Sequence, residues 1–112
     1  MTGVQTCALP IWRGDLARRS AETGAQAMAW LTTALSSHPS VKEVRGEGLM
    51  IGIEFREAGT GVRLMDILRN HGVLALCSGD RGETLSITPA LNIPWEQLVQ
   101  ALAKVAHAVS LA

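Results

Sequence analysis

The chain has 112 residues with ten basic and ten acidic side chains, so its formal net charge is zero. This balance gives no electrostatic reason to expect nucleic acid or an anionic membrane as a partner. No apolar run approaches the roughly 20 residues needed to span a bilayer. Apolar residues make up 47% of the sequence, which is rich for a small domain and indicates a face that packs against another part of a protein.

Residues 1–11 read Met-Thr-Gly-Val-Gln-Thr-Cys-Ala-Leu-Pro-Ile and resemble no secretory or transit signal. The same peptide is the translation of a sequencing adapter read from a GTG start codon. We therefore interpret residues 1–11 as adapter-derived, with Trp12 at the junction; the alternative is a natural disordered tail. Residues 12–112 then form one small domain, in which Cys77 is a single thiol that cannot form a disulfide framework.

Residues 15–37 predict a long helix, because alanine is frequent and apolar residues recur at three- and four-residue spacing. Residues 41–45 and 49–55 predict two strands joined by a turn at Gly46-Glu47-Gly48. This turn is not a dinucleotide fingerprint, because a third glycine and a following helix are missing.

The second half of the chain predicts a helix over residues 62–70 closed by Gly72, strands over 73–77 and 84–88 joined by a polar turn over 78–82, and a final helix opened by Pro94. The element order is helix, strand, strand, helix, strand, strand, helix. This order predicts an α/β fold, specifically an α+β two-layer sandwich with a small, largely antiparallel sheet.

No group of residues in the sequence forms an active site by itself. His38, His71 and His107 are far apart and lack a cysteine or carboxylate at metal-ligand spacing, so we predict capping or solvated roles and no metal site. Schiff-base chemistry needs a desolvated lysine beside a cofactor. Because Lys42 and Lys104 lack that setting, we predict no catalytic and no cofactor-binding residue in this chain.

Four motifs occur in order along the chain: Leu35-Ser-Ser-His-Pro39, Val41-Lys-Glu-Val-Arg-Gly-Glu-Gly-Leu-Met50, Asn70-His-Gly-Val-Leu74, and Leu85-Ser-Ile-Thr-Pro-Ala-Leu91 followed by the last helix. Together they resemble class-III pyridoxal-phosphate-dependent aminotransferases, the ornithine and 4-aminobutyrate aminotransferase family. The resemblance covers residues 14–112. It implies that the chain is the C-terminal part of the small domain of a fold-type-I enzyme. The missing N-terminal large domain would carry the Schiff-base lysine and the phosphate-binding residues.

The resemblance also implies an activity. The intact enzyme would be a cytoplasmic homodimer that uses pyridoxal 5′-phosphate to transfer an amino group from an amine or amino-acid donor to a 2-oxo acid. This chain alone would be inactive, because the cofactor-binding groups would lie upstream.

One position departs from the family pattern. Many members have an arginine just before a Pro-Pro-Leu region, where its planar fork holds a substrate carboxylate. Ser86 occupies that position here, and Ala90 replaces the second proline. The resemblance therefore makes Ser86 a candidate substrate-binding residue that cannot clamp an α-carboxylate in the usual way. The donor would be an ω-amine or a diamine, or another residue would take over.

Two alternatives stay open. The chain could be a stand-alone, non-catalytic α/β binding or regulatory domain, which would need a closed core and a native start near residue 12. The intact protein could also catalyse a different pyridoxal-dependent reaction, such as decarboxylation or racemisation, because that outcome depends on groups around the cofactor.

Overall fold

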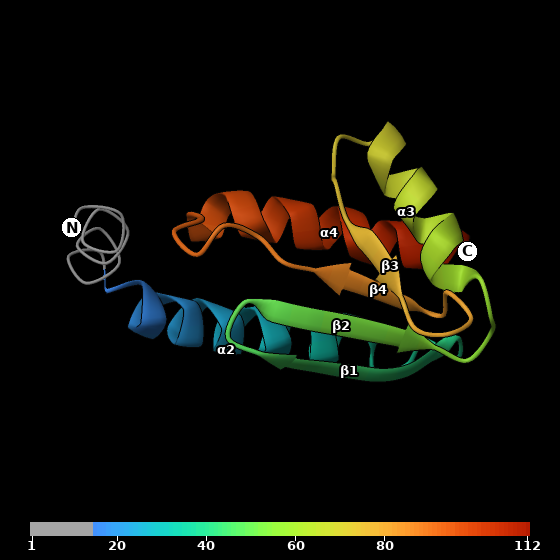
Figure 1. Ribbon diagram of the computed structural model, residues 1–112, viewed down its shortest axis with the longest axis horizontal. Helices are drawn as coiled ribbons and strands as arrows, with labels where there is room; N and C mark the ends of the chain where they lie inside the picture. The colour runs from blue at the N-terminus through green and yellow to red at the C-terminus, as the bar shows by residue number, and fades with distance from the viewer. Residues whose placement is uncertain (1–14) are drawn as a thin grey trace, which may run out of the picture.

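The computed structural model describes residues 15–112, so the interpretation of residues 1–11 lies outside the described part of the chain. The elements follow the predicted order (Figure 1). The helices are α2 (Leu16–Leu35), α3 (Thr60–Asn70) and α4 (Trp95–Leu111), and the strands are β1 (Val41–Glu47), β2 (Met50–Phe55), β3 (Leu76–Ser78) and β4 (Thr84–Ile87).

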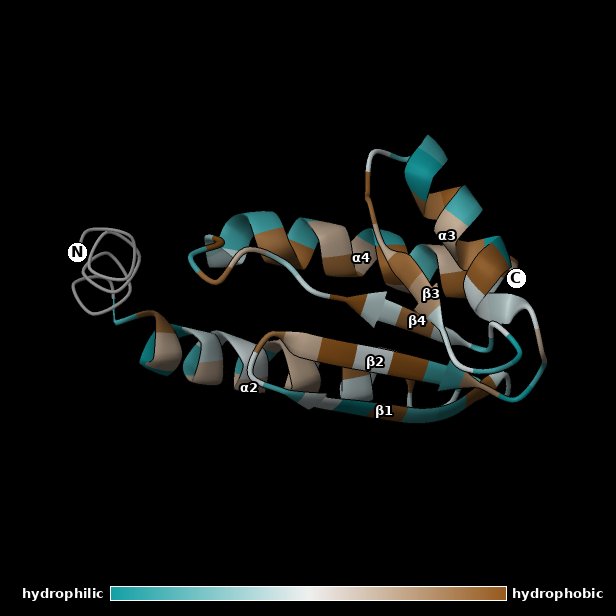
Figure 2. Cartoon of the chain, in the orientation of Figure 1, coloured by the Kyte–Doolittle hydropathy of each residue, from teal (hydrophilic) through white to brown (hydrophobic). Residues whose placement is uncertain are grey.

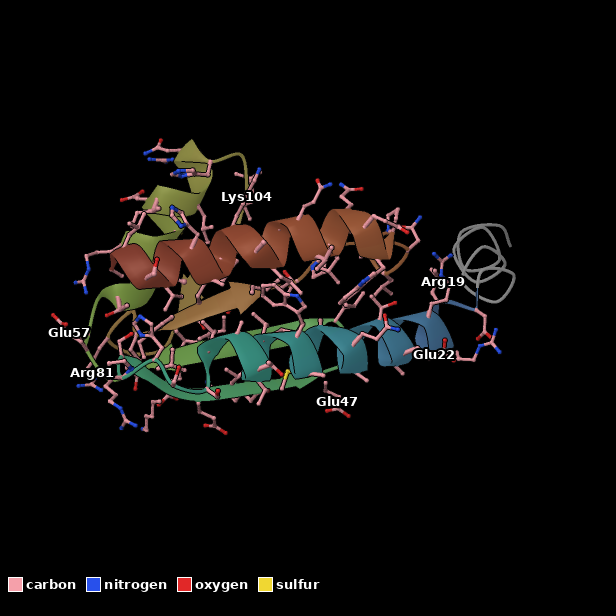
Figure 3. The ribbon with its side chains drawn as sticks, turned by 180° about the vertical axis from the view of Figure 1, so that it is seen from behind. Arg19, Glu22, Glu47, Glu57, Arg81 and Lys104 are labelled. Atoms are coloured by element: carbon pink, nitrogen blue, oxygen red, sulfur yellow. The ribbon has the colours of Figure 1, made fainter. Side chains whose placement is uncertain are left out.

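The four strands form one sheet in the order β1-β2-β4-β3, and all three pairings are antiparallel. The helices pack on one side of this sheet, and Figure 3 shows α2 and α4 lying together in front of it when the molecule is seen from behind. Among residues 15–112 no helix covers the opposite side, and we call it the helix-free face. The predicted two-layer α/β sandwich is confirmed.

The hydrophobic core lies between the sheet and the helices. On β2, Ile51, Ile53 and Phe55 are each at most 2% exposed, and Figure 2 shows the alternation of apolar and polar residues along this strand. Successive strand residues point to opposite faces, so these three side chains point towards the helices and the residues between them lie on the helix-free face. The predicted apolar stripe of α4 is confirmed as core, since its four residues are buried: Leu98, Leu102, Val105 and Val109.

The first hairpin is tighter than predicted. We expected a turn over residues 46–48, but Gly46 remains in β1 and Glu47 pairs with Met50, so only Gly48 and Leu49 form the loop. A two-residue hairpin loop needs positive φ at a central residue. Gly48 has φ of 57°, and as a glycine it adopts this angle without steric cost.

The third strand also differs from its prediction. Residues 73–77 were expected to form it, but only Leu76–Ser78 pair with β4. The N–H of Val73 instead donates to the carbonyl oxygen of Leu68 and closes the end of α3. The apolar residues 73–75 therefore precede the part of the chain that pairs with β4. Ser78, which was expected in the turn, pairs with Thr84.

The remaining boundaries shift by one or two residues. The first helix, expected over 15–37, spans Leu16–Leu35, and the strand expected over 84–88 ends at Ile87. The second helix begins at Thr60 rather than at residue 62, and the Thr60 hydroxyl donates to the carbonyl oxygen of Glu57 there. Pro94 is the N-cap of the final helix, outside its first turn.

The described residues contain neither a membrane-spanning helix nor a cluster of metal ligands. No helix among residues 15–112 is long and apolar enough to cross a bilayer. No group of three or more histidine, cysteine, aspartate or glutamate side chains in the same range is placed to hold a metal ion.

Candidate functional site

Ser86 lies on β4, and its register places it on the helix-free face. Its partners in the ladder are Gly52 on β2 and Leu76 on β3, and Gly52 in turn pairs with Arg45 on β1. These four residues therefore form one row across the sheet. The Ser86 Oγ lies 3.0 Å from the Ser78 Oγ, so the two hydroxyls form a hydrogen bond.

A shallow groove surrounds this row on the helix-free face, and we call it the sheet groove. Its lining includes Arg45, Glu47, Met50, Gly52, Ser78, Thr84, Ser86 and Thr88. Four of these residues carry a hydroxyl, Arg45 carries a positive charge and Glu47 carries a negative charge. Gly52 has no side chain, so the middle of the groove is bare backbone. The sheet groove therefore presents hydroxyl groups that can hydrogen-bond a small polar group.

An ion-pair network borders the groove on the side of β1. The Glu54 carboxylate lies 2.8 Å from the Lys42 Nζ and 3.0 Å from the Arg45 Nη1, and its side chain is only 18% exposed. The hydrogen bond from Lys42 and then the one from Arg45 hold the pKa of Glu54 below its ordinary value. Arg45 Nη1 also lies 3.4 Å from Glu43. The network is thus balanced, with two positive and two negative side chains.

Neither lysine has the setting of a Schiff-base residue. The Lys42 side chain is 58% exposed and paired with Glu54, and the Lys104 Nζ donates to the carbonyl oxygen of His71. A Schiff-base lysine must be desolvated so that its amine can be neutral. Both lysines are thus exposed or bonded to polar partners within the described residues.

The histidines are separate, as the sequence indicates. His71 ends α3, where its Nδ1 lies 2.8 Å from the carbonyl oxygen of Ile67, so this imidazole caps the helix. His38 Nδ1 lies 2.8 Å from the Ser40 hydroxyl. Both contacts are local. The His71 contact fits the predicted capping role, whereas the His38 contact lies between α2 and β1 and caps no helix.

The sequence made Ser86 a candidate, which stays a prediction, and did not predict the side chains that lie beside it. Ser78 was expected in the turn, Gly52 and Arg45 were treated only as strand residues, and only the register brings them beside Ser86. One signal could have found them. Arg45 and Gly52 are symmetric about the Gly48-Leu49 loop, and a two-residue hairpin pairs such positions.

The described residues thus form an antiparallel sheet with helices on one side and the sheet groove on the helix-free face. A family model for class-III aminotransferases matches residues 8–109, and the chain belongs to this family.

Curated relatives and a solved structure agree with this assignment. The chain is similar to acetylornithine aminotransferase of Methanothermobacter thermautotrophicus, with 35% identity over 85% of this chain and 23% of the relative. It is also similar to ornithine aminotransferase 2 of Staphylococcus aureus, with 37% identity over 83% of this chain and 22% of the relative. The crystal structure of a Bacillus anthracis aminotransferase has the same fold, with a TM-score of 0.84 and 21% identity over 91% of this chain and 26% of that chain. The chain thus spans about a quarter of the length of the proteins it matches.

Proposed function

We propose that this chain is the C-terminal part of the small domain of a fold-type-I, pyridoxal 5′-phosphate-dependent aminotransferase. The intact enzyme transfers an amino group from an amine or amino-acid donor to a 2-oxo acid. The match to the class-III family over residues 8–109 carries this proposal. The small share of each relative that the chain covers supports the view that a large domain completes the enzyme.

The cofactor lysine is proposed to belong to that large domain. Pyridoxal 5′-phosphate supplies an electron sink when bound, and its attachment needs a lysine that this chain does not offer in a desolvated position. Lys42 and Lys104 are both held at the surface by polar partners. We therefore expect the chain alone to be inactive.

The helix-free face is proposed to dock on the large domain. Apolar side chains project there without cover, with Met50 72% exposed and Leu76 66% exposed. Neighbouring Leu74 is 88% exposed. Scattered exposed apolar residues are ordinary, but several beside one groove are typical of an interaction surface. We further propose a cytoplasmic homodimer, which is compatible with Cys77 being the single thiol of the domain.

Ser86 is proposed to face the substrate within that docked surface. Its hydroxyl is neutral and already bonded to Ser78, so it cannot act as a bidentate cation for a carboxylate. The donor end of the substrate that lies beside Ser86 is therefore an amine-bearing group without an α-carboxylate, as in an ω-amine or a diamine.

The test begins with the source DNA upstream of the codon for Arg13. We expect an open reading frame of several hundred codons that encodes a lysine in a pyridoxal-binding context. The complete product should transfer an amino group from an amine to a 2-oxo acid, whereas the 112-residue chain should not. A stop codon followed by a genuine start near Arg13 would overturn the proposal and favour the stand-alone binding domain.

A further inference from the structure

We propose that Arg45 binds a carboxylate of the substrate above Gly52, in place of the arginine that is absent at Ser86. This inference rests on the proposed aminotransferase function, because the 2-oxo acid acceptor in that reaction always carries a carboxylate. The carboxylate of the acceptor would then be bound by Arg45, which lies two strands away from Ser86. This assignment also leaves Ser86 free to face a donor without an α-carboxylate.

The sheet register supplies the geometry. Arg45, Gly52 and Ser86 are successive partners across three neighbouring strands, and such residues share one face. The backbones of β1 and β4 are then two strand spacings apart, about 9.6 Å. Gly52 adds no side chain to the space between them, and the Arg45 stem and the Thr84 methyl group border that space. A Cβ atom built on Gly52 would lie 3.9 Å from the Arg45 Nε and 3.6 Å from the Thr84 Cγ2.

The guanidinium of Arg45 has one edge available for that space. Within residues 15–112, its contacts to Glu54 and Glu43 are both made by Nη1. The N–H groups of Nε and Nη2 form the other edge, and Nε borders the space above Gly52. Two parallel N–H groups on a guanidinium match the two oxygens of a carboxylate. Glu54 therefore orients Arg45 while leaving a bidentate edge for a ligand.

The charges around the groove permit an anion to bind. The Glu54 carboxylate is shared between Arg45 and Lys42, and Lys42 is the closer of the two at 2.8 Å. Glu43 is 56% exposed, and Glu47 at the edge of the groove is also exposed, so solvent screens both charges. Across the gap, the hydroxyls of Ser78 and Ser86 have two protons and use one for their mutual hydrogen bond. The remaining O–H can donate to the far oxygen of the same ligand.

The first variant is Arg45→Gln in the complete enzyme. We expect the KM for the 2-oxo acid to rise roughly 10- to 100-fold, since a hydrogen-bonded charge contributes about that factor to binding. The Kd for glutarate, a dicarboxylate without a keto group, should rise by a similar factor. Arg45→Lys keeps the charge but loses the two parallel N–H groups. Its KM and its glutarate Kd should therefore lie between those of the wild type and those of Arg45→Gln.

Gly52→Ala tests the space rather than the charge. The added methyl group has ordinary van der Waals contacts with Thr84 and Arg45, so the protein should fold normally. The methyl group would nevertheless occupy the position proposed for the carboxylate, and the KM and the glutarate Kd should rise. This variant keeps the proposal testable even if Arg45→Gln is unstable.

Lys42→Gln is the matched control. It removes the other cationic partner of Glu54 without changing the space above Gly52. Since Glu54 then relies on Arg45 alone, both constants should rise slightly, but much less than in Arg45→Gln. An increase in Lys42→Gln equal to that in Arg45→Gln would show that loss of the ion-pair network causes the effect, and would overturn the proposal.

The two proposals fail in different ways. A complete wild-type enzyme that transfers no amino group overturns the proposed function, and glutarate binding still decides the role of Arg45. An active enzyme whose KM and glutarate Kd are unchanged by Arg45→Gln and by Gly52→Ala overturns only the role of Arg45.

Discussion

Gly24 in the middle of α2 lies directly against the backbone of Gly48 in the β1-β2 loop. A Cβ atom at Gly24 would come within 2.9 Å of the Gly48 Cα and closer still to its carbonyl carbon and oxygen. Gly24 is itself buried. The absence of a side chain at this position therefore sets how closely the helix approaches the hairpin.

Gly24→Ala should destabilise the chain. Alanine is favoured over glycine inside a helix by roughly 0.5–1 kcal/mol, but the methyl group would overlap backbone atoms that cannot rotate away. Overpacking of this kind costs about 1–3 kcal/mol, so the net free energy of unfolding should fall. Urea unfolding measures this change. Glu22→Ala, on the exposed side of the same helix (Figure 3), is the control and should stay within about 0.5 kcal/mol of wild type. A Gly24→Ala protein as stable as wild type would contradict the close approach.

Glu54 should contribute to stability in a pH-dependent way. Lys42 and Arg45 lower the pKa of its carboxyl group in the folded chain, so the folded state binds protons less readily than the unfolded state. The contribution is therefore complete above the ordinary pKa of a glutamate and is lost as the pH falls through the lowered value. Glu54→Gln should be less stable than wild type at neutral pH, and the difference should shrink in acid. Urea unfolding at both pH values measures it. A difference that does not change with pH would argue against the ion pairs.

Ser86→Arg in the complete enzyme should change donor preference. An arginine there would add a bidentate cation to the sheet groove, and we expect kcat/KM for α-amino acids relative to simple amines to rise roughly tenfold or more. Competing donors in one assay provide the measurement. Ser86→Asn adds bulk without charge and should not produce the shift. If Ser86→Arg leaves the preference unchanged, the position does not belong to the substrate site.

The isolated chain should self-associate through the helix-free face. Met50 and Leu76 are exposed there, and replacing both with serine should lower the apparent mass measured by light scattering. Substitutions of exposed residues usually change stability by less than about 0.5 kcal/mol, so the fold should be retained. Leu111→Ser is the matched control, because Leu111 is 58% exposed at the end of α4. A monodisperse wild-type monomer would contradict both this prediction and the docking role proposed for the face.

The sequence predicted a helix or strand correctly where the spacing of apolar residues fits only one kind of element. The apolar stripe of α4 and the buried alternation of β2 follow directly from periodicity. The errors occur where a residue has two possible partners. Gly46 could have formed a turn but pairs with Ile51, and the N–H of Val73 could have joined a strand but bonds to the end of α3. Such choices depend on the competing hydrogen bonds available after folding.

The sequence by itself determined the order of the elements, the family motifs and the presence of serine at position 86, because these depend on residue type and local spacing. Only the tertiary structure decided that Arg45, Gly52 and Ser86 lie in one row beside Ser78. These residues are distant in the chain, and strand register brings them together. A shift of one residue in register would move each of these side chains to the opposite face of the sheet.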